Sequence, residues 1–382
     1  MAELSTRIAF SEEPGLLRDT AVSFCRDKSP MSAVRALLMD ERGYDPAVWA
    51  EMLSLGWTGL AVPERFGGAG LSLAEAATLA EPMGRYLLAT PWAGTQLFIQ
   101  GLLAGGDAAQ QDTYLSLLAS GDIGTVALFG QNGDWDLTCN ETTGVRVGQS
   151  VRLTGMKTLV RDAAAADFLL VSFLLDGAPA LALLRAEALP PERRRREVVI
   201  DETCRSYSLD LDGIGVPGAA LITGAAAGRA LRAIGDAALL LAAAKAAGGI
   251  AGVLDVTVAY LNTRTAFGRR IGAFQSLKHA CADILIGLER ARSHVYHAAT
   301  LLASNEDAEI ALRMAKAEAC DVFAHAGDRA VQFHGGFGFT YECDAQLFLR
   351  RALWLQYTHG DSAYHRRRLA DLLLPRPGKS MP

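Results

Sequence analysis

The chain has 382 residues, half of them hydrophobic, and its formal net charge is −5 at pH 7. This length and apolar content predict a packed globular chain with two or three domains. Charges of both signs are interspersed, which excludes a strong basic field of the kind that attracts nucleic acid or an anionic membrane surface.

Six cysteines are scattered along the chain, with neither metal-ligand spacing nor close pairing. This pattern predicts buried thiols in a reducing compartment, and hence a cytoplasmic protein. Residues 1–11 carry charges of both signs and no apolar core, so we expect no signal peptide. The most apolar run, residues 234–258, contains Asp236, Lys245 and Asp255, which favour a buried helix over a membrane span.

Residues 1–122 are predicted to be all-α. Apolar residues recur every three or four positions in residues 13–25 and 46–55, and Ser72 with Glu75 forms the pattern of a capping box that opens a helix through Leu79. The Gly-rich loop at residues 67–70 predicts a turn with positive φ. It lacks GxGxxG spacing after a strand, which argues against a dinucleotide-binding Rossmann unit.

Residues 123–222 are predicted to form a β domain, because short β-prone runs alternate there with Gly, Asp and Asn turns. The run of four arginines at residues 193–196 follows two prolines and predicts a solvated loop. A contact with an adenosine phosphate is the alternative.

Residues 223–382 are predicted to form an α-helical bundle, with helices near residues 225–263, 273–303, 304–333, 344–354 and 365–374. Ser304 and Asp307 form a second capping-box pattern, which predicts the start of the third helix. The Ala- and Gly-rich residues 242–249 predict close approach of a neighbouring helix, and a widened ligand pocket is the alternative.

The turn between the first two bundle helices combines Arg264, Phe267 and Gln275. A planar cation, a ring and an amide at the junction of two helices suit a phosphate-bearing cofactor with an aromatic head, because the guanidinium offers a fork to phosphate. A solvated basic turn is the alternative interpretation.

At this turn the sequence resembles the acyl-CoA dehydrogenase family. Residues 260–275, Tyr-Leu-x-x-Arg-x-x-Phe-Gly-x-x-Ile-x-x-Phe-Gln, are similar to the helix-turn-helix signature of that family. Residues 332–340 and 59–71 resemble two further family motifs, in the family's order. The resemblance implies an α+β fold with an N-terminal helical domain, a middle β-barrel or sandwich and a C-terminal four-helix bundle.

The resemblance also implies an activity, the FAD-dependent α,β-dehydrogenation of an acyl-CoA thioester. In that reaction a carboxylate removes the α-proton and the β-hydrogen leaves as hydride to the flavin, whose electrons pass to an electron-transferring flavoprotein or a similar acceptor. By motif match, the residues that contact FAD are Arg264, Thr265, Phe267, Gln275, Gln332, Gly335 and Gly336.

The first four of these residues are expected to contact the FAD of a neighbouring subunit, so the resemblance implies an oligomer, a dimer or a tetramer of paired dimers. His334 has no carboxylate near it in the sequence and is predicted to be a packed interior histidine.

The chain departs from the family's pattern at several positions. Residues 128–135 replace a Thr-Glu-Pro-x-x-Gly-Ser motif, and Leu159 and Arg161 stand where an aromatic and a hydroxyl residue are usual. The two positions that carry the catalytic glutamate in different family members are His359 and Ala238.

These departures leave three hypotheses. In the first, the chain is an active dehydrogenase that uses Asp361 or an unrecognised base; Asp236 is the other nearby carboxylate, and capping of the helix near His365 is the alternative role of Asp361. In the second, the chain is a partner subunit with little or no activity alone, and a sibling chain of the heteromer supplies the glutamate. A structural paralogue without activity is the third hypothesis, because fold does not settle function.

Overall fold

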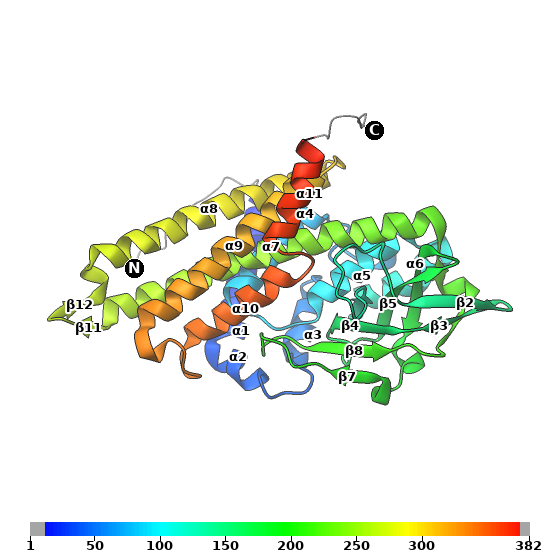
Figure 1. Cartoon of the computed structure of the whole chain (residues 1–382), viewed down its shortest axis with the longest axis horizontal. Coiled ribbons are helices and arrows are strands. Elements are labelled where there is room, and N and C mark those ends of the chain that lie inside the picture. The colour runs from blue at the N-terminus through cyan, green and yellow to red at the C-terminus, as the bar shows by residue number, and fades with distance from the viewer. Residues whose placement is uncertain (1–11, 375–382) are drawn as a thin grey trace.

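The computed structural model describes residues 12–374. It has the predicted α+β architecture, with a β region between two helical regions (Figure 1). The N-terminal helices are α1 (Glu12–Lys28), α2 (Met31–Leu37), α3 (Pro46–Ser54), α4 (Leu73–Arg85), α5 (Trp92–Gly105) and α6 (Ala108–Ala119). The C-terminal helices are α7 (Gly224–Thr263), α8 (Gln275–Ala303), α9 (Glu309–His334), α10 (Asp344–Tyr357) and α11 (Ser362–Leu373).

The predicted capping box opens α4. The Ser72 hydroxyl accepts a hydrogen bond from the Ala74 amide at 3.1 Å, and the Glu75 carboxylate accepts one from the Ser72 amide at 2.8 Å. The helix continues past the predicted Leu79 to Arg85. Gly67 and Gly70 in the preceding loop have φ values of 83° and 63°, which confirms that this loop needs glycine.

Two sheets build the middle region. The strands are β1 (Gly124–Ala127), β2 (Thr143–Val147), β3 (Ser150–Thr154), β4 (Met156–Arg161), β5 (Phe168–Leu175), β6 (Ala178–Arg185), β7 (Arg194–Arg196), β8 (Ser206–Asp210), β9 (Gly215–Pro217) and β10 (Leu221–Ile222). One sheet has the order β10-β6-β5-β2-β3-β9 with β1 also paired to β5, and the other has the order β4-β8-β7. Apolar side chains from both sheets share one core, which includes Val160, Leu169 and Leu209.

The arginine run and the third bundle helix differ from prediction. Arg194 to Arg196 form strand β7 rather than a loop, and Arg194 donates hydrogen bonds to the carbonyls of Leu189 and Ala186. Backbone hydrogen bonds to β8 thus order this charged segment, because backbone amides and carbonyls need hydrogen-bond partners. Helix α9 begins at Glu309, because Ser304 ends α8 and the Asp307 carboxylate instead accepts from the Glu309 amide.

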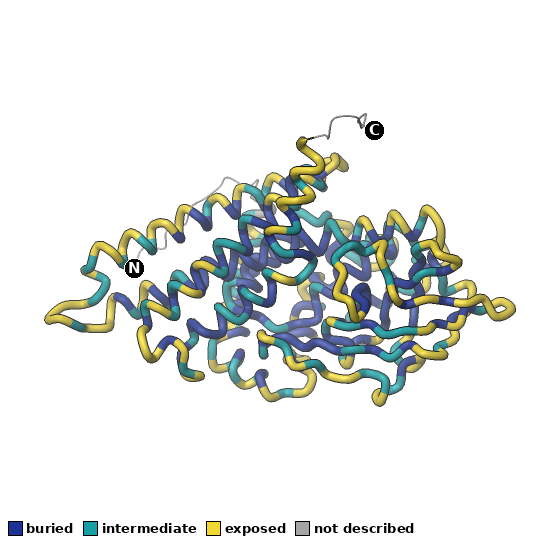
Figure 2. Tube along the Cα trace, in the orientation of Figure 1, coloured by how far each residue is buried: buried dark blue, intermediate teal, exposed yellow. Residues whose placement is uncertain are grey.

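Helix α7 is the centre of the bundle. It packs against α4, α5, α8, α9 and α10, and its middle is buried while both of its ends approach the surface (Figure 2). It is also the one described helix long and apolar enough to cross a membrane, but 89% of its apolar window is buried inside the fold. That burial identifies a core helix, as the charges in residues 234–258 predicted.

Small residues let α4 lie directly against α7. A Cβ atom at Gly248 would overlap the Glu81 carbonyl oxygen, and one at Gly84 would overlap the Lys245 carbonyl oxygen. The buried Glu81 carboxylate then crosses to α8, where it accepts hydrogen bonds from Arg292 and from the Tyr296 hydroxyl, each at 2.9 Å. The prediction of close helix approach at residues 242–249 is therefore confirmed.

We expect Gly248→Ala to lower the free energy of unfolding by roughly 1–3 kcal/mol, because the added methyl forces α4 and α7 apart. The matched control is Gly228→Ala on the exposed face of the same helix, where a Cβ meets nothing within 4 Å. That change should raise stability by about 0.5–1 kcal/mol, because alanine has the higher helix propensity. Calorimetric melting of both variants measures the difference. Equal effects of the two substitutions would contradict the packing role of Gly248.

Candidate active site

The predicted cofactor corner lies at one end of the molecule. Strands β11 (Thr265–Ala266) and β12 (Arg269–Arg270) form a small hairpin whose turn residues, Phe267 and Gly268, have φ values of 53° and 75°. Arg264, Thr265 and Gln275 are exposed, and the Phe267 side chain is 92% exposed. No hydrogen bond or ion pair engages the Arg264 side chain in the described part of the chain. The corner thus presents an unpaired guanidinium beside a bare aromatic ring.

The second group of predicted cofactor residues adjoins this corner. The His334 ring stacks on the Tyr260 ring with centroids 4.1 Å apart, and its Nδ1 lies 2.7 Å from the Ala330 carbonyl oxygen. His334 is buried, which confirms it as a packed interior histidine. By this stacking it holds the exposed Gln332, Gly335 and Gly336 next to the end of α7.

The corner is far from the cavity that lies between the β region and the bundle of the same chain. Figure 1 shows β11 and β12 at one end of the long axis and the β region at the other. Lys245 of α7 lines the cavity, whereas Arg264 directly follows the C-terminal end of that helix. At the α-helical rise, the 19 residues between them span about 28 Å. The corner therefore cannot act on a ligand in its own chain's cavity.

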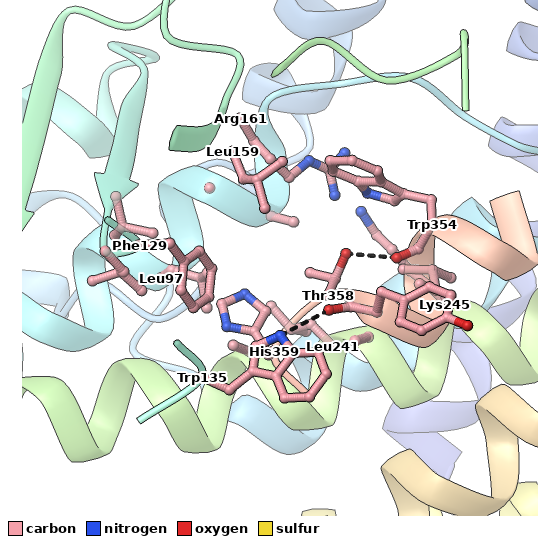
Figure 3. A pocket seen from close by; sticks show the side chains of 18 of the residues that line it. Leu97, Phe129, Trp135, Leu159, Arg161, Leu241, Lys245, Trp354, Thr358 and His359 are labelled. Atoms are coloured by element: carbon pink, nitrogen blue, oxygen red, sulfur yellow. Dashed lines mark hydrogen bonds between the residues drawn. The ribbon is translucent and has the colours of Figure 1, made fainter. Parts of the chain in front are cut away.

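A cavity of about 230 Å³ lies between the β region and the bundle. Its walls come from α5, β1, β4, α7, the C-terminal half of α10 and the loop before α11 (Figure 3). All four family-departure positions, Leu159, Arg161, Ala238 and His359, line it, as do Leu128, Phe129 and Trp135 of the replaced motif. The positions that sequence comparison singled out therefore converge in space.

The ionisable groups of this cavity are cations and a histidine. Among residues 12–374, its lining contains Arg161, Lys245 and His359 but neither aspartate nor glutamate. Burial, together with the nearby Arg161 and Arg351 guanidinium groups, lowers the pKa of Lys245 to about 7. Burial likewise lowers the pKa of His359 to about 3, with Lys316 and Arg161 contributing. His359 is thus neutral at pH 7 and too weak a base to remove a proton efficiently.

The two nearby carboxylates lie outside the cavity lining. Asp361 is the N-cap of α11, and its carboxylate accepts a hydrogen bond from the Tyr364 amide at 2.7 Å. The predicted capping role is thus present, and the role of Asp361 as a base stays a prediction. Burial raises the pKa of Asp236 to about 6, with Arg232 opposing the shift.

Polar contacts that the sequence did not reveal, most of them buried, position the cavity wall. The Arg351 side chain of α10 pairs with Asp201 and donates to Thr203 in the segment between β7 and β8. Lys316 donates to the Gly360 carbonyl at 2.9 Å, and Trp135 donates to the Tyr357 carbonyl at 3.1 Å. These partners lie far apart in the sequence, so no local pattern could have identified them.

Two family models match the chain. The model described as "Acyl-CoA dehydrogenase, N-terminal domain" matches residues 11–122, and the one described as "Acyl-CoA dehydrogenase, C-terminal domain" matches residues 228–374. Acyl-CoA dehydrogenase IpdE2 of Mycolicibacterium smegmatis is 32% identical over 346 residues, which cover 90% of this chain and 93% of that protein. The chain belongs to the acyl-CoA dehydrogenase family.

Solved structures agree with this membership. The Tcur3481-Tcur3483 steroid ACAD G363A variant is 28% identical, with a TM-score of 0.85 over 95% of this chain and 98% of that chain. The ChsE4-ChsE5 complex from Mycobacterium tuberculosis shares the fold, with a TM-score of 0.87 at 24% identity over 97% of this chain and 99% of that chain. This acyl-CoA dehydrogenase thus keeps the family's fold while its cavity lining lacks a carboxylate.

We expect His359→Asn to reduce the loss of stability in acid. In the wild type the unfolded chain binds a proton at His359 near pH 6.5, whereas the folded chain does so only near pH 3. The free energy of unfolding therefore falls by up to about 1.4 kcal/mol per pH unit, through His359 alone, as the pH falls from 6.5 toward 3. Asparagine does not titrate there and tolerates the φ of 59° at this position.

Denaturant unfolding of the His359→Asn variant between pH 7 and pH 4 tests this expectation. His325→Asn on the exposed face of α9 is the matched control for loss of an imidazole. An unchanged pH slope in the His359→Asn variant would show that His359 titrates normally in the folded chain.

Proposed function

We propose that this chain works as a subunit of an FAD-dependent acyl-CoA dehydrogenase, and that its corner completes the FAD site of a neighbouring subunit. The observation that carries the proposal is the exposed, unpaired corner formed by Arg264 and Phe267, far from its own chain's cavity. A planar cation and an aromatic ring left bare on a surface suit a ligand held at a protein–protein boundary.

The residues of the corner fit FAD. The Arg264 guanidinium is free to form forked hydrogen bonds with a phosphate. Gly335 and Gly336 leave open space where other residues carry a Cβ atom, so a pyrophosphate can approach the backbone. Thr265, Gln275 and Gln332 add exposed polar groups around it.

The chain's own cavity does not fit FAD together with an acyl thioester. Its volume of about 230 Å³ is below the ~300–1,000 Å³ of sites that hold drug-sized ligands. Arg161 and Trp354 occupy the side of the cavity next to β4 (Figure 3). The FAD site of this proposal is therefore the shared one at the corner.

When bound there, FAD supplies the oxidising power that takes up the β-hydrogen of the acyl group. The α-proton needs a carboxylate in a dry pocket. Because the described cavity lining offers none, we propose that a sibling chain of the same fold supplies it. The double names of the two solved complexes are compatible with such a heteromer.

The remaining functional assignments extend the family's chemistry to this chain. We propose an acyl-CoA substrate, an electron-transferring flavoprotein as the acceptor and a cytoplasmic location. Four of the six cysteines are buried and all six are free thiols, which suits a reducing compartment, although Cys139 is exposed rather than buried as expected.

We expect Arg264→Met to lower the FAD content of the assembled enzyme, because a charge-assisted hydrogen bond to phosphate contributes about 1.5–3 kcal/mol. That range corresponds to a roughly 10- to 150-fold weaker affinity for FAD. The assay is the flavin absorbance per oligomer after co-purification with the product of the adjacent coding region. Arg146→Met is the control, since Arg146 is an exposed arginine at the opposite end of the molecule. A normal FAD content in the Arg264→Met oligomer would remove the corner from the site.

The source of the base is tested with Asp361→Asn. Asparagine caps helices about as well as aspartate, so the start of α11 should remain intact while the carboxylate is lost. If a sibling chain supplies the base, an acyl-CoA should still bleach the flavin under anaerobic conditions at the wild-type rate. Loss of bleaching with FAD still bound would instead assign Asp361 as the base. Asp236→Asn serves as the parallel variant for the other nearby carboxylate.

A further inference from the structure

Three hydrogen-bond donors meet at one side of the cavity without an acceptor. The Nε1 of Trp354 and the Nε of Arg161 are buried and have no hydrogen-bond partner in the part of the chain that the structure describes. Lys245 is 5% exposed, and no hydrogen bond or ion pair joins its ammonium to another residue between 12 and 374. Arg161 and Lys245 both reach toward the Trp354 indole (Figure 3). We call these three residues the donor cluster.

Different elements hold the donor cluster together. Arg161 ends β4, Lys245 projects from the middle of α7, and Trp354 belongs to α10. The Trp354 side chain is 8% exposed, and Arg161 makes only a weak contact of 3.6 Å with the Cys204 sulfur. Leaving donors buried and unsatisfied is costly in a folded protein, so a buried set of them indicates a ligand that the donors bind.

The charged groups around the donor cluster are mostly positive. Burial lowers the pKa of Lys245, and Arg161 and Arg351 lie close enough to add to that shift, while Cys204 and Asp162 oppose it. The buried Asp201 is already paired with Arg351. Burial raises the pKa of Asp162, while Arg161 and Lys245 oppose that shift, so this carboxyl partly balances the charge of Lys245. A ligand that brings its own negative charge would balance this excess of positive charge.

The rest of the cavity is mostly apolar, with Thr125, Thr358 and His359 among its other polar residues. Leu97 of α5, Leu128 and Phe129 after β1, and Ala238 and Leu241 of α7 form its other walls. A cavity with apolar walls and a few convergent polar groups is typical of a small-molecule site, in which the polar groups set the orientation of the ligand. Its volume of about 230 Å³ limits the ligand to a small one.

We propose that this cavity binds a small carboxylate with an apolar body, whose carboxylate group is held by Arg161, Lys245 and the Trp354 indole N–H. The guanidinium can form two parallel hydrogen bonds to the carboxylate, the ammonium adds charge, and the indole adds one neutral donor. This site is separate from the corner, so its existence does not depend on where FAD binds.

Such a carboxylate has two possible sources. It is either a free organic acid or the carboxylate at the far end of a dicarboxylic acyl chain whose other end is the thioester. Both sources present the same chemistry to the donor cluster, and they differ in whether coenzyme A adds affinity.

Calorimetric titration of the assembled protein with cyclohexanecarboxylate tests the proposal. We expect saturable binding of one molecule per chain, and no detectable binding of the neutral cyclohexylmethanol. Lys245→Met should weaken the binding of cyclohexanecarboxylate by roughly tenfold or more, because a hydrogen bond to a charged group is lost. Lys278→Met on the exposed surface of α8 is the matched control and should leave the affinity unchanged.

A second variant distinguishes a loss of binding from a folding defect in the Lys245→Met protein. Trp354→Phe keeps an aromatic ring and removes only the N–H, so we expect a weaker, several-fold loss of affinity with an unchanged melting temperature. The proposal is overturned if cyclohexanecarboxylate fails to bind the wild type, if cyclohexylmethanol binds equally well, or if the Trp354→Phe and Lys245→Met variants both bind cyclohexanecarboxylate normally.

Titration with adipoyl-CoA and hexanoyl-CoA distinguishes the two sources. If the ligand is a dicarboxylic acyl chain, adipoyl-CoA should bind more tightly than both hexanoyl-CoA and cyclohexanecarboxylate, and Lys245→Met should abolish its advantage. If the ligand is a free acid, cyclohexanecarboxylate should bind more tightly than either thioester. The Arg264→Met variant should bind cyclohexanecarboxylate as the wild type does, so a failure of the corner to bind FAD is distinguishable from a failure of this site.

Discussion

The close packing of α4 on α7 is the constraint on which the rest of the structure depends. Glycines on both helices bring the backbones into direct contact, and no larger residue fits at Gly84 or Gly248 without overlap. With its middle held in this way, the 40 residues of α7 extend from the β region to the corner. One rigid helix therefore places Lys245 in the cavity and Arg264 at the opposite end of the molecule.

This arrangement separates two tasks that one chain cannot combine. The corner displays groups suited to a dinucleotide, whereas the cavity displays cations and apolar walls. A neighbouring subunit must meet the corner for its exposed guanidinium and ring to be used. This separation is the physical basis of our proposal that a neighbouring subunit uses the corner, and it leaves the cavity as a distinct site.

The cavity has a lining whose described residues include no carboxylate. His359 and Ala238 stand at the two usual glutamate positions, and both line the cavity. Burial lowers the pKa of both Lys245 and His359, and the neighbouring Arg161 guanidinium lowers both further in a lining whose described residues include no carboxylate. The electrostatics therefore favour an anion in the ligand rather than proton abstraction by the protein.

The sequence by itself determined the fold, the helix starts with strong local signals and the family, because periodicity, capping at Ser72 and the motif around Arg264 are encoded in neighbouring residues. It failed at Ser304 and at residues 194–196, where the helix start and the strand depend on partners elsewhere in the fold. Only the tertiary structure decided that Arg161, Lys245 and Trp354 converge, and that Arg351 pairs with Asp201 across 150 positions of the sequence. Neighbouring residues do not predict such contacts, because the contacts form only when elements far apart in the sequence pack together and bury charged groups side by side.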